Sequence, residues 1–255
     1  MRTLRLVALA WWRSSLESWS WRSFMVTLVL DQTAGPLVGL LVWTAVDPAS
    51  PEIRTYFLVL LAVQLSTVSY EDHTLCTSIF DGTLSDALLR PQPVLIQFIG
   101  TNLAIRSWHT VFGLPILVVV GIAADVRLDP WQVALAVPAI VVAGAVRFTF
   151  TTVLALSAFW TQRAAAVVAL GNTLIMLLGG VAAPLFLLPS GLSDIGRLLP
   201  MWSMLGLPAE IAAGAVSAND LVVAFALQCA WLVLLTGAVV AVWRRGLRVF
   251  TAVGA

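Results

Sequence analysis

The chain has 255 residues, of which 60% are hydrophobic and only 11% are charged. A soluble domain carries about 25% charged residues, so this composition excludes an ordinary soluble protein and indicates an integral membrane protein. The net charge of +1 does not point to any class of partner, and nothing in the composition suggests nucleic-acid binding. The apolar runs are about 20 residues long, which favours an all-α helical bundle over a barrel of short alternating strands.

The chain contains no lysine, since all 14 basic residues are arginine. A standard phosphate-binding P-loop requires a lysine, so we expect any ATP hydrolysis to occur in another subunit. The sequence has no zinc-protease motif, no Cys/His cluster and no nucleophile elbow, so we expect no metal, no cofactor and no catalytic residue in this chain. Cys76 and Cys229 are expected to be free thiols.

The N-terminal segment, residues 1–22, combines several tryptophans and arginines with leucines and valines. This composition predicts an interfacial helix on the cytoplasmic leaflet rather than a cleaved signal peptide. About six spans follow, over residues 24–46, 56–70, 106–123, 131–160, 165–187 and 221–243. Residues 94–102 are expected to approach the third span along the interface. Prolines and glycines break residues 188–219 into pieces too short to span, which predicts re-entrant helices on the outer side.

Residues 71–93 form a polar island between two apolar segments. Leu75 and Ile79 predict a short helix that ends at Gly82. Thr83 is a candidate N-cap of a second helix, with Asp86 completing a capping box. This helix places Leu84, Ala87 and Leu88 on one face and Arg90 in the last turn, before Pro91 and Pro93 end it.

The distribution of arginines predicts the orientation, because cytoplasmic loops carry an excess of them. With the N-terminus inside, the inner side carries Arg2, Arg5, Arg13, Arg22, Arg90, Arg163, Arg244, Arg245 and Arg248, and the outer side carries Arg54, Arg127 and Arg197. Both termini and the polar island are therefore expected in the cytoplasm of a bacterial cell, with the protein in the plasma membrane.

Three charged residues fall inside predicted spans, where charge is costly. Asp31 and Arg147 are predicted at similar depths and form a candidate ion pair, and Arg106 lies closer to the inner surface. These side chains either line a polar path or a head-group site, or form a buried pair that fixes helix register.

The fragment Asp81-Gly-Thr-Leu-Ser-Asp-Ala-Leu-Leu-Arg-Pro91, within this layout of spans, resembles a signature of bacterial type-2 ABC exporter permeases. The family concerned is the ABC-2 family transporter proteins, first catalogued as a domain of unknown function. The architectural resemblance covers nearly the whole chain and the motif covers this fragment.

The resemblance implies a permease that works as a dimer, with an identical or homologous second permease, and with two copies of a cytoplasmic ATPase that binds ATP and magnesium. Residues 71–93 would form the coupling element that docks on the ATPase, and residues 188–219 would close the outer gate. The residues expected to carry the coupling are Ile79, Phe80, Asp81, Gly82, Thr83, Leu84, Asp86, Leu88, Leu89, Arg90 and Pro91. The resemblance fixes no substrate, so drugs, antibiotics, peptides and lipids all remain candidates.

Two functions from other classes stay open at this point. The chain is alternatively a non-transporting membrane anchor whose residues 71–93 bind another cytoplasmic protein. A secondary carrier is the other alternative, although such carriers ordinarily need more carboxylates in the membrane than Asp31. The absence of an internal repeat also counts against a carrier built from inverted repeats.

Overall fold

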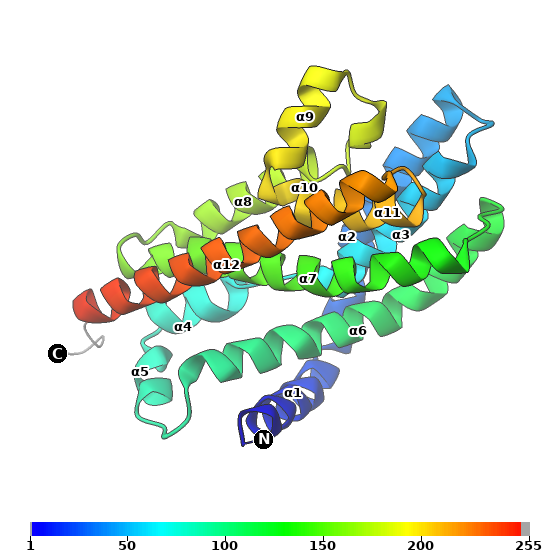
Figure 1. Cartoon of the computed structure of the whole chain (residues 1–255). Helices are drawn as coiled ribbons and strands as arrows, with labels where there is room; N and C mark the ends of the chain where they lie inside the picture. The colour runs from blue at the N-terminus through cyan, green and yellow to red at the C-terminus, as the bar shows by residue number, and fades with distance from the viewer. Residues whose placement is uncertain (1, 251–255) are drawn as a thin grey trace.

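Long apolar helices run side by side through most of the molecule (Figure 1). The computed structural model describes residues 2–250, and no strand occurs among them. The helices are α1 (Arg2–Ser20), α2 (Arg22–Val46), α3 (Pro51–Thr67), the π-helix η1 (Asp72–Cys76), α4 (Thr77–Phe80), α5 (Thr83–Leu88), α6 (Val94–Ala123), α7 (Pro130–Ala155), the 3-10 helix η2 (Leu156–Phe159), α8 (Ala164–Leu178), the 3-10 helix η3 (Leu185–Leu187), α9 (Ser190–Leu198), α10 (Pro200–Met204), α11 (Gly206–Ala212) and α12 (Ala218–Val249). Met1 and residues 251–255, which the predicted N- and C-terminal segments include, lie outside the described residues.

Five helical segments of the described chain are long and apolar enough to cross a membrane: 22–46, 51–80, 94–123, 130–159 and 218–249. The expectation of an all-α membrane protein is confirmed. Residues 94–123 differ from the expectation of an interfacial approach followed by a span. They form the single 30-residue helix α6, because no proline or glycine pair interrupts its first three turns.

The fifth predicted span is shorter than expected. Helix α8 ends at Leu178 and has only 15 residues, because Gly180 takes a left-handed conformation with φ 93°. The carbonyl of Gly180 accepts a 2.9 Å hydrogen bond from the Tyr56 hydroxyl, and a Cβ at Gly180 would lie 2.2 Å from that hydroxyl oxygen. Gly179 and Gly180 therefore end α8 against α3.

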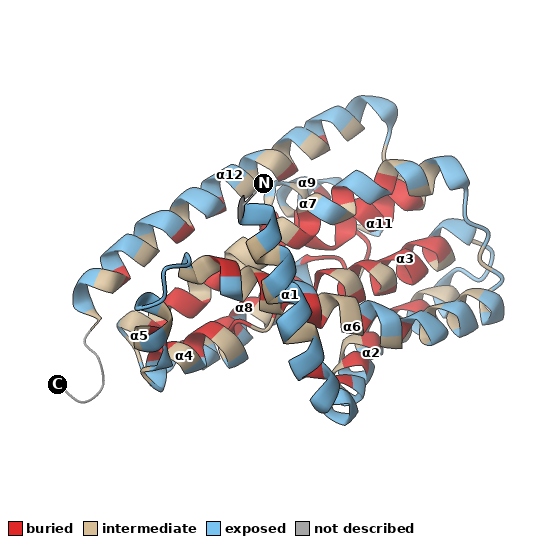
Figure 2. Cartoon of the chain, turned by 90° about the horizontal axis from the view of Figure 1, so that it is seen from below, coloured by how far each residue is buried: buried red, intermediate tan, exposed pale blue. Residues whose placement is uncertain are grey.

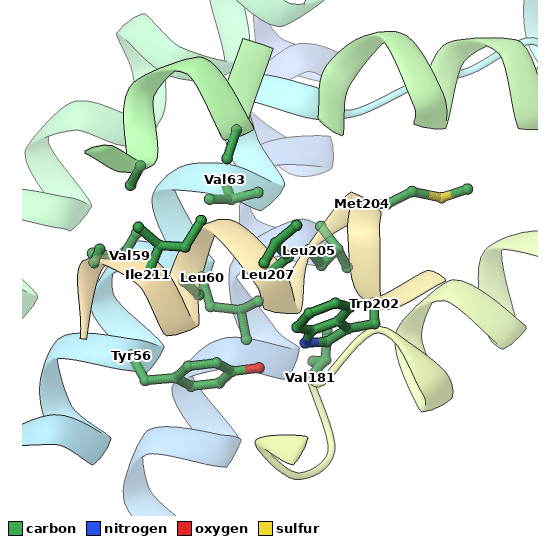
Figure 3. Packing of buried hydrophobic residues seen from close by; sticks show 14 of the residues in the cluster. Tyr56, Val59, Leu60, Val63, Val181, Trp202, Met204, Leu205, Leu207 and Ile211 are labelled. Carbon is green, nitrogen blue, oxygen red and sulfur yellow. The ribbon is translucent and has the colours of Figure 1, made fainter. Parts of the chain in front are cut away.

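Helix α3 lies at the centre of the bundle. In its 51–80 segment 72% of the most apolar window is buried, against 22% for both α6 and α12 (Figure 2). The expected broken helices are present as α9, α10 and α11. Helices α10 and α11 fold back onto the bundle, while α9 packs against α10 and η3. Figure 3 shows Leu205, Leu207 and Ile211 packed beside Leu60 and Val63 of α3. Helices α10 and α11 thus complete the main apolar core.

Helix α1 crosses the long helices and packs against α6 (Figure 2). The two helices approach closely at Gly100, where a Cβ would lie 2.4 Å from the Cβ of Ala10. Trp11 Nε1 donates to Ser107 Oγ at 3.1 Å, and Trp108 Nε1 donates to the Ser15 carbonyl at 3.1 Å. Helix α1 is therefore fastened along the first half of α6.

The bundle has two distinct ends (Figure 1). One, the basic end, carries α4, α5, the start of α8 and the last turns of α12, with Arg90, Arg163 and the arginines of α12. The opposite end carries the loops 47–50, 124–129 and 213–217. Helices α3, α7 and α12 begin there with the side-chain N-caps Ser50, Asp129 and Ser217.

Candidate functional site

Residues 71–93 fold at the basic end as η1, α4 and α5, followed by a short proline-containing link to α6. Gly82 separates α4 from α5 with φ 72°, in the left-handed region that favours glycine, and the predicted helix end at Gly82 is confirmed. The predicted capping box is wrong. Gly82 itself is the N-cap residue of α5, and Thr83 is already helical, so its hydroxyl contacts the Ser78 carbonyl at 3.5 Å instead.

The inner face of this region is anchored in an apolar cluster. Leu75, Cys76, Ile79 and Leu84 are buried there with residues of α7, η2, α8 and α12. Leu84 is fully enclosed and Ile79 is 5% exposed. Ile79 and Leu84, expected from the sequence to meet a partner, therefore pack within this chain, because they lie on the inward face of two short helices.

The outward face of the region presents a different set of side chains. Leu89 is 85% exposed, Leu88 39% and Phe80 36%. We define the outer face as these three apolar residues together with exposed Asp81, Thr83 and Asp86. Arg90 and Pro91 are also exposed, but they follow the end of α5 at Leu88, so Arg90 does not lie in a last turn as expected. Gly82 is half-buried between the two helices.

Glu71 is only 2% exposed, so its carboxyl group does not face outward. Its Oε1 accepts a 3.0 Å hydrogen bond from Asn102 Nδ2 of α6, and its Oε2 accepts a 2.6 Å bond from Thr151 Oγ1 of α7. Asn102 Nδ2 also donates to Ser69 Oγ at 3.1 Å. The residue that begins the polar island thus ties it to two long helices.

The two arginines of the membrane segments lie near this carboxyl group but bond to other atoms. Arg106 donates to the carbonyls of Val68 at 2.9 Å and Gly144 at 2.8 Å, and to Ser69 Oγ at 3.0 Å. Arg147 is 5% exposed and its NH1 donates to Thr67 Oγ1 at 3.2 Å. Ser69 therefore links Arg106 to Asn102 and, through Asn102, to Glu71. We call Glu71, Asn102, Thr151, Ser69, Arg106 and Arg147 the polar cluster.

The predicted ion pair between Asp31 and Arg147 is wrong. Asp31 is exposed on α2 and accepts a 3.2 Å hydrogen bond from Gln32 Nε2. Among the described side chains, the one contact within 4.0 Å between a carboxylate and a basic side chain is Asp72 with His73, at 3.5 Å. Similar depth in two spans does not bring side chains together when the spans present different faces, and here Arg147 faces α3, where Thr67 accepts its hydrogen bond.

Sequence reasoning missed Glu71 and Asn102 as structural partners. A usable signal was present, because Glu71 ends one apolar segment while Asn102 and Thr151 are polar residues near the same end of the next two. In the described part of the chain, no group of three or more His, Cys, Asp or Glu side chains is placed to hold a metal ion. The arrangement of residues 71–93 can position a docking face.

The comparisons with known proteins identify the family. A family model described as ABC-2 family transporter protein matches residues 41–254. That match covers α3 to α12 in full and includes all of residues 71–93. Neither the curated proteins nor the solved structures gave a match. A long-helix bundle with a short helical elbow at its basic end fits such a membrane subunit, and the chain belongs to the ABC-2 family of transporter proteins.

Proposed function

We propose that this chain is the permease subunit of an ATP-driven exporter, and that the outer face of residues 71–93 docks on a cytoplasmic ABC ATPase. The family supplies the permease role. The observation that carries the docking proposal is the placement of Leu89, 85% exposed, beside the acidic residues of two short anchored helices. An exposed apolar group ringed by charge is typical of a protein interaction site.

Rigidity of this element supports a coupling role. A coupling element has to move the spans when the partner moves, so it has to be fixed at both ends. Leu75, Ile79 and Leu84 fix it to α7, α8 and α12, and Glu71 fixes its start to α6 and α7. A displacement of α5 is therefore transmitted to several long helices at once, because close-packed cores transmit strain.

The remaining parts of the proposal follow from the family and the arginine distribution. The basic end faces the cytoplasm of a bacterial cell, as do both termini, because arginines gather there. Two such permeases, identical or homologous, work with two ATPase copies that hold ATP and magnesium. Helices α9, α10 and α11 lie toward the outer side. The polar cluster holds the helices in register. The transported compound is a small molecule, drug, antibiotic, peptide or lipid.

Co-purification of the permease with its ABC ATPase tests the docking face. Leu89→Asp places a charge on a largely exposed position, so it leaves folding intact and weakens the apolar contact. Leu128→Asp is the matched control, since Leu128 is 47% exposed in the loop at the opposite end. We expect Leu89→Asp to lose the ATPase and the ATP hydrolysis of the complex, while Leu128→Asp keeps both. Full retention of the ATPase and its activity by Leu89→Asp would contradict the assignment of the docking face to residues 71–93.

A further inference from the structure

A polar cavity of about 220 Å³ lies at the junction of α1, the link after α5 and the start of α6. Two guanidinium groups line it: Arg13 from α1 and Arg90 from the link. The amides of Gln92 and Gln97 line it as well. Arginine presents a planar fork of donors that fits phosphate oxygens, and amide groups add further donors. This set of side chains is suited to an anion.

The side chains that line the cavity carry a net positive charge. Glu17 also lines it, one helical turn after Arg13, so two cations face one carboxylate. The order Arg then Glu along a helix is the less favourable one for an ion pair, and these two residues are not within 4.0 Å of each other in the described structure. Both arginines are exposed and available to a ligand.

Apolar side chains also line the cavity. Leu6 and Leu9 of α1 line it together with the arginines. Further along α1, Leu4 is 75% exposed and Trp12 is 58% exposed. A helix with exposed leucines and tryptophans and with basic residues on its polar side is typical of a segment lying in the membrane interface. An anion that also carries acyl chains would satisfy both kinds of lining residue.

Contacts between α1 and α6 fix the position of the side chains that line the cavity. Ser14 Oγ and Thr101 Oγ1, which both line it, are 3.0 Å apart and join α1 to α6. The close approach of the two helices at Gly100 fixes the same place. A site smaller than the 300–1,000 Å³ usual for drug-sized ligands suits a head group, with the chains outside it.

We propose that this cavity binds the phosphate group of an anionic phospholipid from the surrounding leaflet. Basic pockets beside membrane helices recognise such head groups, and juxtamembrane arginines add attraction to anionic lipid surfaces. Since Arg90 lies in the link after α5 and Arg13 belongs to α1, a bound lipid bridges the two segments. The lipid thereby holds the link after α5 against the interfacial helix.

Ligand-dependent thermal stability of the purified permease in detergent tests this proposal without any ATPase, so its outcome is independent of the proposed function. The probes are short-chain phosphatidylglycerol, phosphatidylcholine with the same chains, and inorganic phosphate. We expect phosphatidylglycerol to raise the melting temperature most, because it carries both the negative charge and the acyl chains. Equal shifts with phosphatidylcholine, or the full shift with inorganic phosphate alone, would overturn the lipid assignment.

Variants locate the site. Arg13→Gln and Arg90→Gln should each weaken the apparent affinity for phosphatidylglycerol about tenfold, the size of one charge-assisted hydrogen bond. Arg5→Gln, on the exposed part of α1 outside the cavity lining, should leave it unchanged. Glu17→Gln should strengthen phosphatidylglycerol binding, because it removes a negative charge beside the phosphate. A purely structural role of α1 would not make this variant bind more tightly while the arginine variants bind more weakly. Unchanged affinity in both arginine variants, or weaker binding in Glu17→Gln, would refute the proposal.

Discussion

Removing the carboxyl group of Glu71 should be among the most damaging single changes at the basic end. Glu71→Ala deletes the acceptor of two buried hydrogen bonds, from Asn102 at 3.0 Å and from Thr151 at 2.6 Å. It also removes the acidic group nearest to Arg106 and Arg147 in the polar cluster. The change leaves the surface of the outer face untouched, so its effect is on stability and on the attachment of residues 71–93.

The magnitude follows from what each partner retains. A hydrogen bond to a charged group is worth about 1.5–3 kcal/mol in soluble proteins, whereas bonds between membrane helices reach only about 1.7 kcal/mol. Asn102 keeps Ser69 as an acceptor, and Thr151 Oγ1 keeps the Arg147 carbonyl at 2.9 Å. Two bonds near the top of the membrane range, partly compensated, give a destabilisation of about 3 kcal/mol with the lost charge included.

The measurement is reversible unfolding in mixed detergent micelles, followed by the fluorescence of the 11 tryptophans. Asp86→Ala is the matched control, because Asp86 is an exposed carboxylate of the same region. Thr151→Val should cost about 1 kcal/mol alone, and the double variant should be less than additive. If Glu71→Ala destabilises the protein no more than Asp86→Ala, the polar cluster does not anchor the coupling region.

Three further predictions concern particular residues. Gly82→Ala should lower the free energy of unfolding by about 1–2 kcal/mol, because φ is 72° at this position. Gly191→Ala should not lower it, because a Cβ at Gly191 meets nothing within 4 Å. Equal shifts of the melting temperature in the two variants would contradict this prediction. Leu84→Ala should cost about 2–5 kcal/mol by leaving a cavity, and Leu89→Ala almost nothing; a small loss in Leu84→Ala on denaturant unfolding would show that the inner face is not packed as described. Burial raises the pKa of Glu210 in α11 from its ordinary 4.5 to about 7, so the folded state binds the proton more tightly than the unfolded chain, and stability should fall as pH rises from 4.5 through 7. Glu210→Gln should flatten that slope in thermal unfolding while exposed Glu52→Gln keeps it, and an unchanged slope in Glu210→Gln would refute the assignment.

The features that depend on local chemistry were the ones predictable from the sequence. Gly82 was recognisable as a helix end because few other residues take a left-handed conformation easily, and the prolines of residues 188–219 predicted the short helices α9 to α11. The capping box failed because Thr83 offered a plausible cap one residue too late, after Gly82 had already taken that place. A helix boundary that shifts by one residue changes which side chain can cap it.

The sequence places polar candidates near the same ends of neighbouring spans, but it does not determine which side chains bond across helices. The partner of Glu71 depends on the rotation of α6 and α7 about their axes, and a single sequence does not state these rotations. For the same reason Asp31 and Arg147 were paired by depth alone, although Arg147 bonds to Thr67 of α3. The burial of Ile79 and Leu84 within this chain was also not predictable, because an apolar side chain suits a docking face and an internal core equally well.

The length of α12 has a consequence for how the protein sits in bilayers of different thickness. At 1.5 Å per residue its 32 residues span about 48 Å, against a hydrocarbon thickness of about 30 Å. Even a tilt of about 40° leaves roughly 37 Å along the membrane normal, so tilt alone does not fit the whole helix into the hydrocarbon core. Arg244 lies about 39 Å from Ala218 along the helix axis. A helix of this length reaches beyond the hydrocarbon core into the head-group region, so a thicker or thinner membrane changes how much of α12 lies in that region.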